Sequence, residues 1–171
     1  TIGLITTRLD EDGLIQKQDR VRGRVGQPSV PLALNPDGAF AIGIKIGRRS
    51  ADWLLVDFAG QVRQRHSLDY AFPDVASLLP AIALRLNSMH AGLGGLKDRL
   101  IGVGVAAPFQ MGGWHRLLGL SDAQSDTWNQ IDLRAQVQAM TEVPVSFAKD
   151  TSAACVAELV VGRGRDLKNF L

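Results

Sequence analysis

The chain has 171 residues, of which 46% are hydrophobic, 6% aromatic and 21% charged, and this composition excludes a chain that is mainly disordered. The length suffices for one sizeable core, or for a core with an appendage. The 19 Lys and Arg residues exceed the 17 Asp and Glu residues by a formal charge of only +2, which excludes a protein that coats nucleic acid along its whole length.

The first 38 residues differ from the rest of the chain. Ile2, Ile5 and Leu9 are spaced three and four residues apart, which predicts the last turns of an amphipathic helix over residues 1–9. Residues 16–27 are polar and contain several basic side chains, so we expect a hairpin loop or a linker there. Because the chain begins with Thr1 rather than Met, we expect a piece of a longer protein.

Beyond Gly38 the pattern alternates between strands and helices. Apolar runs at 40–46, 53–58 and 62–68 predict three antiparallel strands. Asp74 is the expected N-cap of a helix that reaches Met89 and is kinked at Pro80. The remaining elements are a strand at 100–105, a helix at 129–140, a strand at 143–147, a helix at 151–161 and the opening of a strand at 169–171. This order, βββαβαβα, predicts an α/β fold with a mixed sheet and a ligand site after Ile46, Val105 and Phe147.

Three stretches of the sequence are similar to one protein family. The most specific runs from Val143 to Glu158 and continues through Gly162 and Gly164 to Leu171. The other two are Trp128 to Leu133, and Leu34 to Gly38 followed by a strand that ends Gly43-Ile-Lys-Ile-Gly47. Together they resemble the ROK family, a bacterial group of repressors, open reading frames and sugar kinases. The resemblance covers nearly the whole chain and implies a ribonuclease H-like half-domain of the actin-like ATPase and sugar kinase superfamily.

The resemblance also assigns the front of the chain. It implies that residues 1–27 are the remnant of a winged helix-turn-helix, with its wing and basic linker, as in the repressor branch. Residues 28–171 would then be the N-terminal actin-like lobe, truncated before the second lobe. The residues expected to contact DNA are Thr6, Thr7, Arg8, Arg20, Arg22 and Arg24. On composition alone, a frayed helix and a solvated charged loop explain the same residues.

The end of the first predicted strand bears on enzymatic activity. Phosphoryl transfer needs a Gly-rich turn that admits phosphates and a carboxylate for magnesium. The family's kinases carry Asp followed by a Gly-Gly-Thr type sequence there, whereas this chain has Lys45, Gly47, Arg48 and Arg49. We interpret these residues as a degenerate phosphate loop and expect that the chain is not an enzyme. The alternative for Lys45 is a solvent-facing strand residue.

A sugar site is expected at the ends of the later strands. The residue that matches Asp150 in the family's kinases is the general base for a sugar hydroxyl, and a plain helix N-cap is the alternative. The family's usual Asn before it is Lys149 here, and residues 104–109 replace a Gly-Pro-rich turn, for which a purely structural turn is the alternative. The expected sugar-binding residues are Asp150, Lys149, Ala107, Pro108 and Trp128. Trp114 and His115 are further candidates for stacking, and packing is the alternative for all three of these rings.

These expectations combine into a sugar-responsive transcriptional regulator of the repressor type, whose lobe forms one wall of a sugar-binding cleft. The alternatives are a ROK-type sugar kinase, in which Asp150 would be catalytic and ATP the phosphoryl donor for a hexose, and a domain that retains the fold for dimerisation only. The expected partners are a DNA operator, a sugar or sugar-phosphate effector, and further copies of the chain in a homodimer or tetramer.

No metal or other cofactor is expected in this chain. The His residues and Cys155 do not fall at metal-ligand spacings. The resemblance places the family's zinc ligands in its second half, beyond Leu171. One cysteine and no apolar run near the roughly 20 residues needed to cross a bilayer predict a cytoplasmic protein without a membrane partner.

Overall fold

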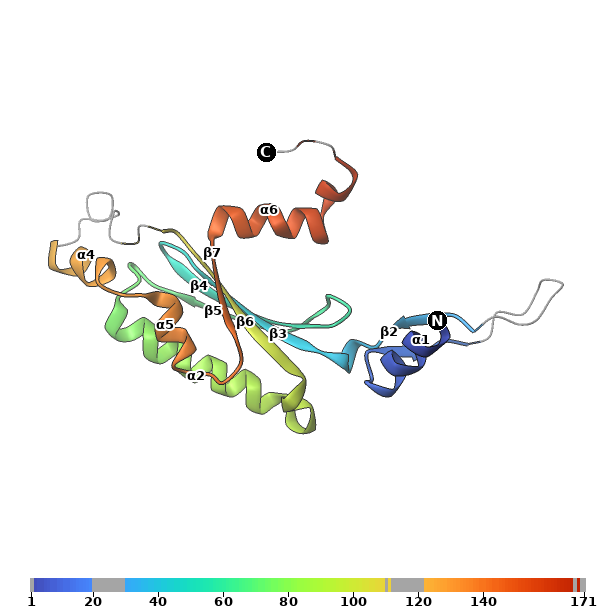
Figure 1. Ribbon diagram of the computed structural model, residues 1–171. Coiled ribbons are helices and arrows are strands. Elements are labelled where there is room, and N and C mark those ends of the chain that lie inside the picture. Colours follow the sequence, from blue (N-terminus) through green and yellow to red (C-terminus); the bar gives the residue numbers. More distant parts are fainter. Residues whose placement is uncertain (1, 20–29, 110, 112–121, 168, 170–171) are drawn as a thin grey trace.

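Two sheets organise the computed structural model of the chain, which describes residues 2–19, 30–109, 111, 122–167 and 169. Helix α1 (Ile2–Glu11) precedes strand β1 (Ile15–Lys17), which pairs antiparallel with β2 (Leu32–Leu34). Gly13 has a φ of 72° and lets the chain reverse between α1 and β1. We call α1, β1 and β2 the N-terminal unit, and it lies beyond one end of the larger sheet (Figure 1).

The larger sheet has five strands in the order β5-β4-β3-β6-β7. Strand β3 pairs antiparallel with β4, and β4 with β5, whereas the β3–β6 and β6–β7 pairs are parallel. The sequence therefore predicted the mixed sheet correctly. The strands are β3 (Phe40–Ile46), β4 (Ser50–Asp57), β5 (Val62–Asp69), β6 (Leu100–Ala107) and β7 (Val145–Lys149).

The core lies between one face of this sheet and two helices. Helices α2 (Val75–Gly92) and α5 (Leu133–Gln138) cover that face, while α6 (Asp150–Val160) lies on the opposite side (Figure 1). Alternate residues of β3 are buried against the helices, as a period of two requires. The largest fully buried side chains include Trp53, Phe40, Ile42, Ile44, Ile46, Leu55, Leu78, Ile82, Met89 and Val137.

Further features of the fold are the cap of α2 and several short 3₁₀ helices. Asp74 is the N-cap of α2, as expected, and its carboxylate accepts a hydrogen bond from the Ser77 backbone N–H at 3.1 Å. Pro80 lies within α2, which continues past it. The 3₁₀ helices with described bounds are η1 (Pro36–Gly38), η2 (Gly94–Arg99) and η4 (Arg163–Asp166). None of the helices in the described ranges is both long and apolar enough to cross a membrane.

The bounds of the helix predicted over residues 129–140 are wrong, because the helix in this region is the shorter α5 (Leu133–Gln138). Helix α4 (Asp122–Asn129) ends where the predicted helix was to begin, and α5 starts at Leu133. Asp132 between them has an extended backbone, and its carboxylate accepts the Ala135 N–H at 3.0 Å. Asp132 is therefore an N-cap that begins a new helix. The strand expected at 169–171 falls largely outside the described residues.

A buried acidic residue holds the turn between β4 and β5. The Asp57 Oδ1 atom accepts the backbone N–H groups of Ala59 and Gln61 at 3.0 and 2.9 Å, and Oδ2 accepts from the Arg63 guanidinium at 3.2 Å. Burial by itself raises the pKa of Asp57, but the hydrogen bonds from Gln61, Arg63 and Ala59 outweigh it and leave the pKa below its ordinary value of 3.8. The turn thus depends on an ionised carboxylate.

Candidate functional site

The three parallel strands end at the same edge of the sheet. Strand β3 ends at Ile46, β6 at Ala107 and β7 at Lys149. Lys45, Ala106 and Ala148 are level with one another across these strands. Ligands of such sheets collect outside the carboxyl ends of the strands, so this edge is the candidate site.

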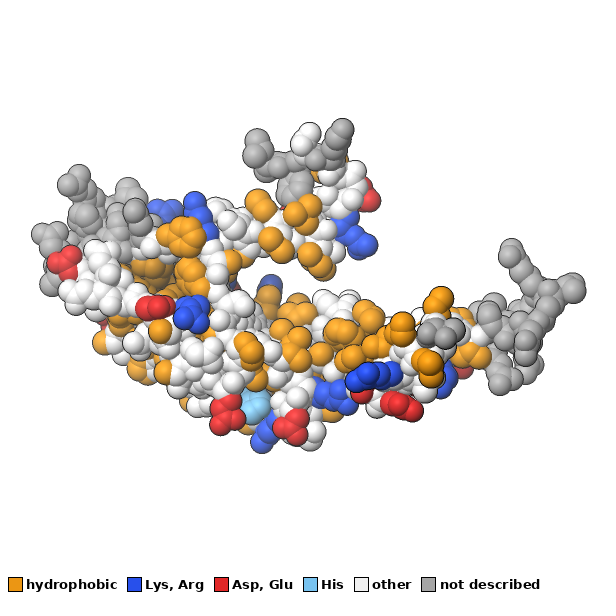
Figure 2. All heavy atoms as spheres, in the orientation of Figure 1, with side chains coloured by type: hydrophobic (Ala, Val, Ile, Leu, Met, Phe, Trp, Pro, Cys, Tyr) orange, Lys and Arg blue, Asp and Glu red, His pale blue; other side chains and the backbone are white. Residues whose placement is uncertain are grey.

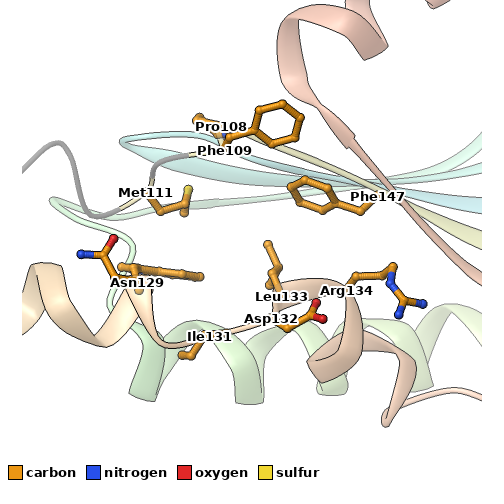
Figure 3. A pocket seen from close by; sticks show the side chains of 10 residues that line it. Pro108, Phe109, Met111, Asn129, Ile131, Asp132, Leu133, Arg134 and Phe147 are labelled. Carbon is orange, nitrogen blue, oxygen red and sulfur yellow. The ribbon is translucent and has the colours of Figure 1, made fainter.

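One cavity lies between the end of β6, Phe147 in the middle of β7 and the segment from α4 to α5, and we call it the strand-end cavity (Figure 3). Its volume is about 520 Å³, which lies in the range of small-molecule sites. The residues that give it its chemical character are Pro108, Phe109, Trp128, Asp132, Arg134 and Phe147. The rings of Phe109 and Phe147 are 6.0 Å apart between centroids and tilted by 31°. Aromatic faces beside a carboxylate and a guanidinium suit a ligand with apolar faces and polar edges, as a sugar has.

Trp128 forms part of the wall of this cavity. It is 5% exposed, and its indole N–H donates a buried hydrogen bond to the Pro73 carbonyl at 2.6 Å. This bond fixes the ring between α4 and the segment that precedes α2. Trp128 is therefore a rigid, largely covered side chain, and its predicted stacking on a sugar stays a prediction.

A second cavity of about 690 Å³ lies between the open face of the sheet and α6, and we call it the sheet-face cavity. Figure 2 shows this hollow with hydrophobic side chains on both sides. Its walls include Lys45 and Asp150, and Phe147 contributes to both cavities, which makes them neighbours. A Cβ atom built on Gly43 or Gly104 would meet nothing within 4 Å, so the sheet backbone is openly accessible at these points.

Asp150 is the first residue of α6 and directly follows β7. Its Oδ1 atom accepts the Thr151 N–H at 2.8 Å, and within the described ranges its other oxygen accepts no hydrogen bond. The half-buried carboxylate at the N-terminus of an 11-residue helix is stabilised by the helix dipole. Asp150 can therefore accept a hydrogen bond from a hydroxyl group that enters the sheet-face cavity.

The structure divides the predicted sugar-binding residues. Pro108 and Trp128 line the strand-end cavity, and Asp150 lines the sheet-face cavity. Lys149 is exposed and lines neither of them. Ala107 is 0% exposed, because it is packed in the core, and the expectation that it contacts a sugar is not supported.

The residues of the degenerate phosphate loop also lie in different places. Lys45 is exposed in the sheet-face cavity, opposite Asp52 on β4. Gly47 lies in the β3–β4 turn, where its carbonyl accepts the Tyr70 hydroxyl at 2.8 Å. Arg48 and Arg49 are exposed in the same turn and line neither cavity.

Several cavity residues were not singled out from the sequence, namely Phe109, Asn129, Asp132, Arg134 and Phe147. A signal did exist, because the family-like stretch of residues 128–133 contains two of them. The sequence did not show that this stretch packs next to the end of β6.

Three of the residues expected to contact DNA lie on α1. Thr7 and Arg8 are exposed, and Thr6 is partly covered. The hydroxyl groups of Thr6 and Thr7 both donate to the Gly3 carbonyl, at 2.9 and 3.0 Å. Arg20, Arg22 and Arg24 lie outside the described residues, as do Trp114 and His115. In the part of the chain that the structure covers, no group of three or more His, Cys, Asp and Glu residues could hold a metal ion.

Comparison with known proteins relates the chain to one family. The sequence model described as "ROK family" matches residues 41–171. Among curated proteins, the xylose repressor of Bacillus spizizenii is 23% identical over 175 aligned residues, which cover 100% of this chain and 44% of that protein. The chain thus spans less than half the length of this relative.

Two solved structures show the fold. A ROK family transcriptional regulator, described as a homologue of the E. coli MLC protein, matches with a TM-score of 0.62 and 21% identity, over 98% of this chain and 42% of that chain. The inorganic polyphosphate/ATP-glucomannokinase of Arthrobacter sp. strain KM matches with a TM-score of 0.51 and 25% identity, over 72% of this chain and 49% of that chain. The predicted fold class, a mixed α/β lobe of the actin-like type, is thereby confirmed.

Proposed function

Since the chain belongs to the ROK family, we propose that it is part of a sugar-responsive transcriptional regulator of the repressor type. In this proposal the N-terminal unit and the basic segment between its strands contact a DNA operator. The strand-end cavity and the sheet-face cavity form one wall of a sugar site, and the second lobe, outside this chain, supplies the other wall. The intact protein would act in the cytoplasm as a homodimer or tetramer.

The observation that carries this proposal is the N-terminal unit itself. A helix with exposed Thr7 and Arg8 is followed by a two-stranded antiparallel hairpin, an arrangement that suits the end of a recognition helix and its wing. The match to the regulator covers 98% of this chain, whereas the match to the glucomannokinase covers 72%. The regulator thus has a counterpart of nearly the whole chain, whereas the kinase has a counterpart of only the larger part. This difference favours the regulator.

The sugar site is supported by the chemistry of the cavities. The free oxygen of Asp150 can accept a hydroxyl hydrogen, and Phe109 and Phe147 offer aromatic surface nearby. Arg134 would add a cation for an effector that carries a phosphate. Because a relative is named a xylose repressor, D-xylose is the first sugar to test.

A sugar kinase is the second candidate, and the likeness to the glucomannokinase together with Asp150 favours it. Lys45 argues against it, since a cation at the end of the first lobe strand cannot take the place of a magnesium-binding carboxylate. In the next turn, the long side chains of the exposed Arg48 and Arg49 stand where a phosphate-binding turn needs small residues. We therefore expect no ATP-dependent phosphorylation of a hexose.

The test is a mobility-shift titration of the full-length protein against its own promoter fragment at two salt concentrations, with and without D-xylose and other aldoses. We expect binding at low salt that weakens as the salt concentration rises, because phosphate contacts release counterions. One of the sugars should change the affinity. The absence of a shift at low salt would contradict the regulator, and turnover of ATP with a hexose at enzyme-like rates would establish the kinase.

Asp150→Ala tests the sugar site within the same assay. We expect this variant to bind the promoter fragment like the wild type but to lose its response to the sugar, because a hydroxyl acceptor has been removed. Asp126→Ala on α4 is the control, since Asp126 is also acidic but is exposed and lines neither cavity. An Asp150→Ala variant with a full sugar response would show that Asp150 is only a helix cap.

A further inference from the structure

One side chain connects the N-terminal unit to the base of the larger sheet. Arg99 is the last residue of η2, directly before β6. Its Nη1 atom donates to the Asp12 carbonyl at 2.7 Å and lies 3.4 Å from the Gly38 carbonyl. Asp12 follows the end of α1, and Gly38 lies two residues before the start of β3. A single guanidinium therefore bridges the helix of the N-terminal unit and the start of the two central strands.

The electrostatics of α1 explain why a cation belongs at this place. The last carbonyl groups of a helix lack partners within the helix and carry partial negative charge. A guanidinium that donates to a carbonyl just beyond Glu11 complements this charge. A Cβ atom built on Gly13 would lie 3.1 Å from Arg99 Nη2, so the guanidinium is packed closely against the turn that follows α1.

Backbone contacts around Arg99 make this junction tight. The Asn35 N–H donates to the Leu14 carbonyl at 2.9 Å, and the Asn35 side-chain amide donates to the Gly13 carbonyl at 2.8 Å. A Cβ atom at Gly38 would come within 2.9 Å of the same Gly13 carbonyl oxygen. Close packing at this junction restricts how the N-terminal unit can be oriented on the lobe. The loss of one of these contacts should therefore allow other orientations.

Strand β6 leads from this junction to the candidate sugar site. It begins directly after Arg99 and ends at Ala107, beyond which Pro108 and Phe109 line the strand-end cavity. Eight residues of extended chain span roughly 26 Å, and both neighbours of β6 are hydrogen-bonded to it. A displacement of Pro108 and Phe109 by a ligand can therefore reach Arg99 through a single, continuous element.

We propose that Arg99 is a positioning residue that sets the orientation of α1 and the wing on the lobe, and that a sugar in the strand-end cavity acts on DNA affinity through it. The inference rests on the proposed function. Such coupling requires two orientations in which the ligand has different affinities. The hydrogen bonds from Arg99 to Asp12 and Gly38 define the orientation seen here.

The experiment measures this orientation and DNA affinity separately, on the full-length protein. Spin labels at Gln16→Cys on β1 and Ser88→Cys on α2, both exposed positions, report the distance between the N-terminal unit and the lobe. The background carries Cys155→Ser, and any cysteine of the full-length protein outside this chain is replaced by Ser as well. The variants are Arg99→Ala, and Lys97→Ala as a control, because Lys97 is an exposed cation on the same 3₁₀ helix.

We expect a narrow distance distribution for the wild type and for Lys97→Ala, and a broad one for Arg99→Ala. The effect of the active sugar on promoter affinity should fall from the range of about 5- to 150-fold that is usual for such coupling to nearly onefold in Arg99→Ala. The sugar should still bind to Arg99→Ala in the absence of DNA, because Arg99 lines neither cavity. Asn35→Asp, which keeps the acceptor for the Asp37 N–H but removes the donor to Gly13, should broaden the distribution as well.

An Arg99→Ala variant with the narrow wild-type distribution would overturn the proposal, and so would full retention of the sugar effect on promoter affinity. Equal broadening by Lys97→Ala would overturn it too, since the effect would then not depend on the bridge. If Arg99→Ala does not fold, Arg99→Gln decides by the same two measurements, because it keeps most of the side-chain length and removes the guanidinium. The distance measurement needs no DNA, whereas a wild type that fails to bind its promoter would contradict the proposed function alone.

Discussion

One added methyl group at Gly38 should open the junction between the N-terminal unit and the lobe. Gly38 is buried, and a Cβ atom there would lie 2.9 Å from the Gly13 carbonyl oxygen, 3.2 Å from Leu14 Cα and 3.4 Å from Phe58 Cδ1. The two shortest of these distances are to backbone atoms, which cannot rotate out of the way. Gly38 does not have a positive φ, so Ala causes no backbone strain there and its cost in the folded state is steric.

The magnitude follows from these distances. Forcing an extra methyl group into a packed site costs about 1–3 kcal/mol. The smaller conformational freedom of Ala in the unfolded chain offsets about 0.4–1 kcal/mol of this cost. The net cost of about 1–2 kcal/mol destabilises the contact between the N-terminal unit and the lobe. The fraction of molecules in which this junction is open should therefore rise by a factor of roughly 5–30.

The assay is native-state amide hydrogen exchange on the full-length protein. The Asn35 N–H donates to the carbonyl of Leu14, the residue that the added methyl group would displace, so its exchange rate should rise by the same factor in Gly38→Ala. Gly43→Ala is the control, because a Cβ atom on Gly43 meets nothing within 4 Å. We expect this control to leave the exchange of Asn35 unchanged. Equal rates in Gly38→Ala and the wild type would refute the steric reasoning.

Two further predictions concern the two ends of β4. Because the pKa of Asp57 is lowered in the fold, its ionised form stabilises the protein above about pH 4, and this contribution disappears as the pH falls through the lowered pKa. The stability deficit of Asp57→Asn in denaturant titrations should therefore be full near pH 7 and shrink below about pH 4, and a deficit that is independent of pH would contradict the role of the charge. Burial, with a smaller contribution from Asp52, raises the pKa of Tyr70, so its hydroxyl stays protonated and shares its one hydrogen between the carbonyls of Gly47 and Ser50, each at 2.8 Å. Tyr70→Phe should lower the free energy of unfolding by about 0.5–1.5 kcal/mol, and equal urea midpoints for variant and wild type would show that the hydroxyl does not hold this turn.

Local patterns accounted for most of the lobe. The alternating apolar residues of β3 and the cap at Asp74 act over a few neighbouring residues, so they are visible in the sequence. The break at Asp132 also had a local signal, because Asp is a strong N-cap, but the helical spacing around it concealed this role. Strands β1 and β2 could not be found in this way, since each has only three residues and gains its stability from a partner far along the chain.

The candidate site was predictable only in part. The sequence placed Asp150 after a strand and Pro108 at the end of another, and both line cavities in the structure. It did not reveal that Ala107, next to Pro108, is turned into the core, or that Phe109 and Phe147 face each other at 6.0 Å. Such facts depend on which face of a strand meets which helix, and that is decided when the layers pack.

The sequence by itself determined the order of the elements, the mixed sheet and the likeness to the ROK family, because hydrophobic period, caps and family-specific stretches are properties of neighbouring residues. Only the tertiary structure decided which distant residues meet. Arg99 and Asp12 are 87 positions apart and form one hydrogen bond, and the two cavities combine residues from several elements. These contacts arise from packing across the whole lobe, and no local pattern in the chain records them.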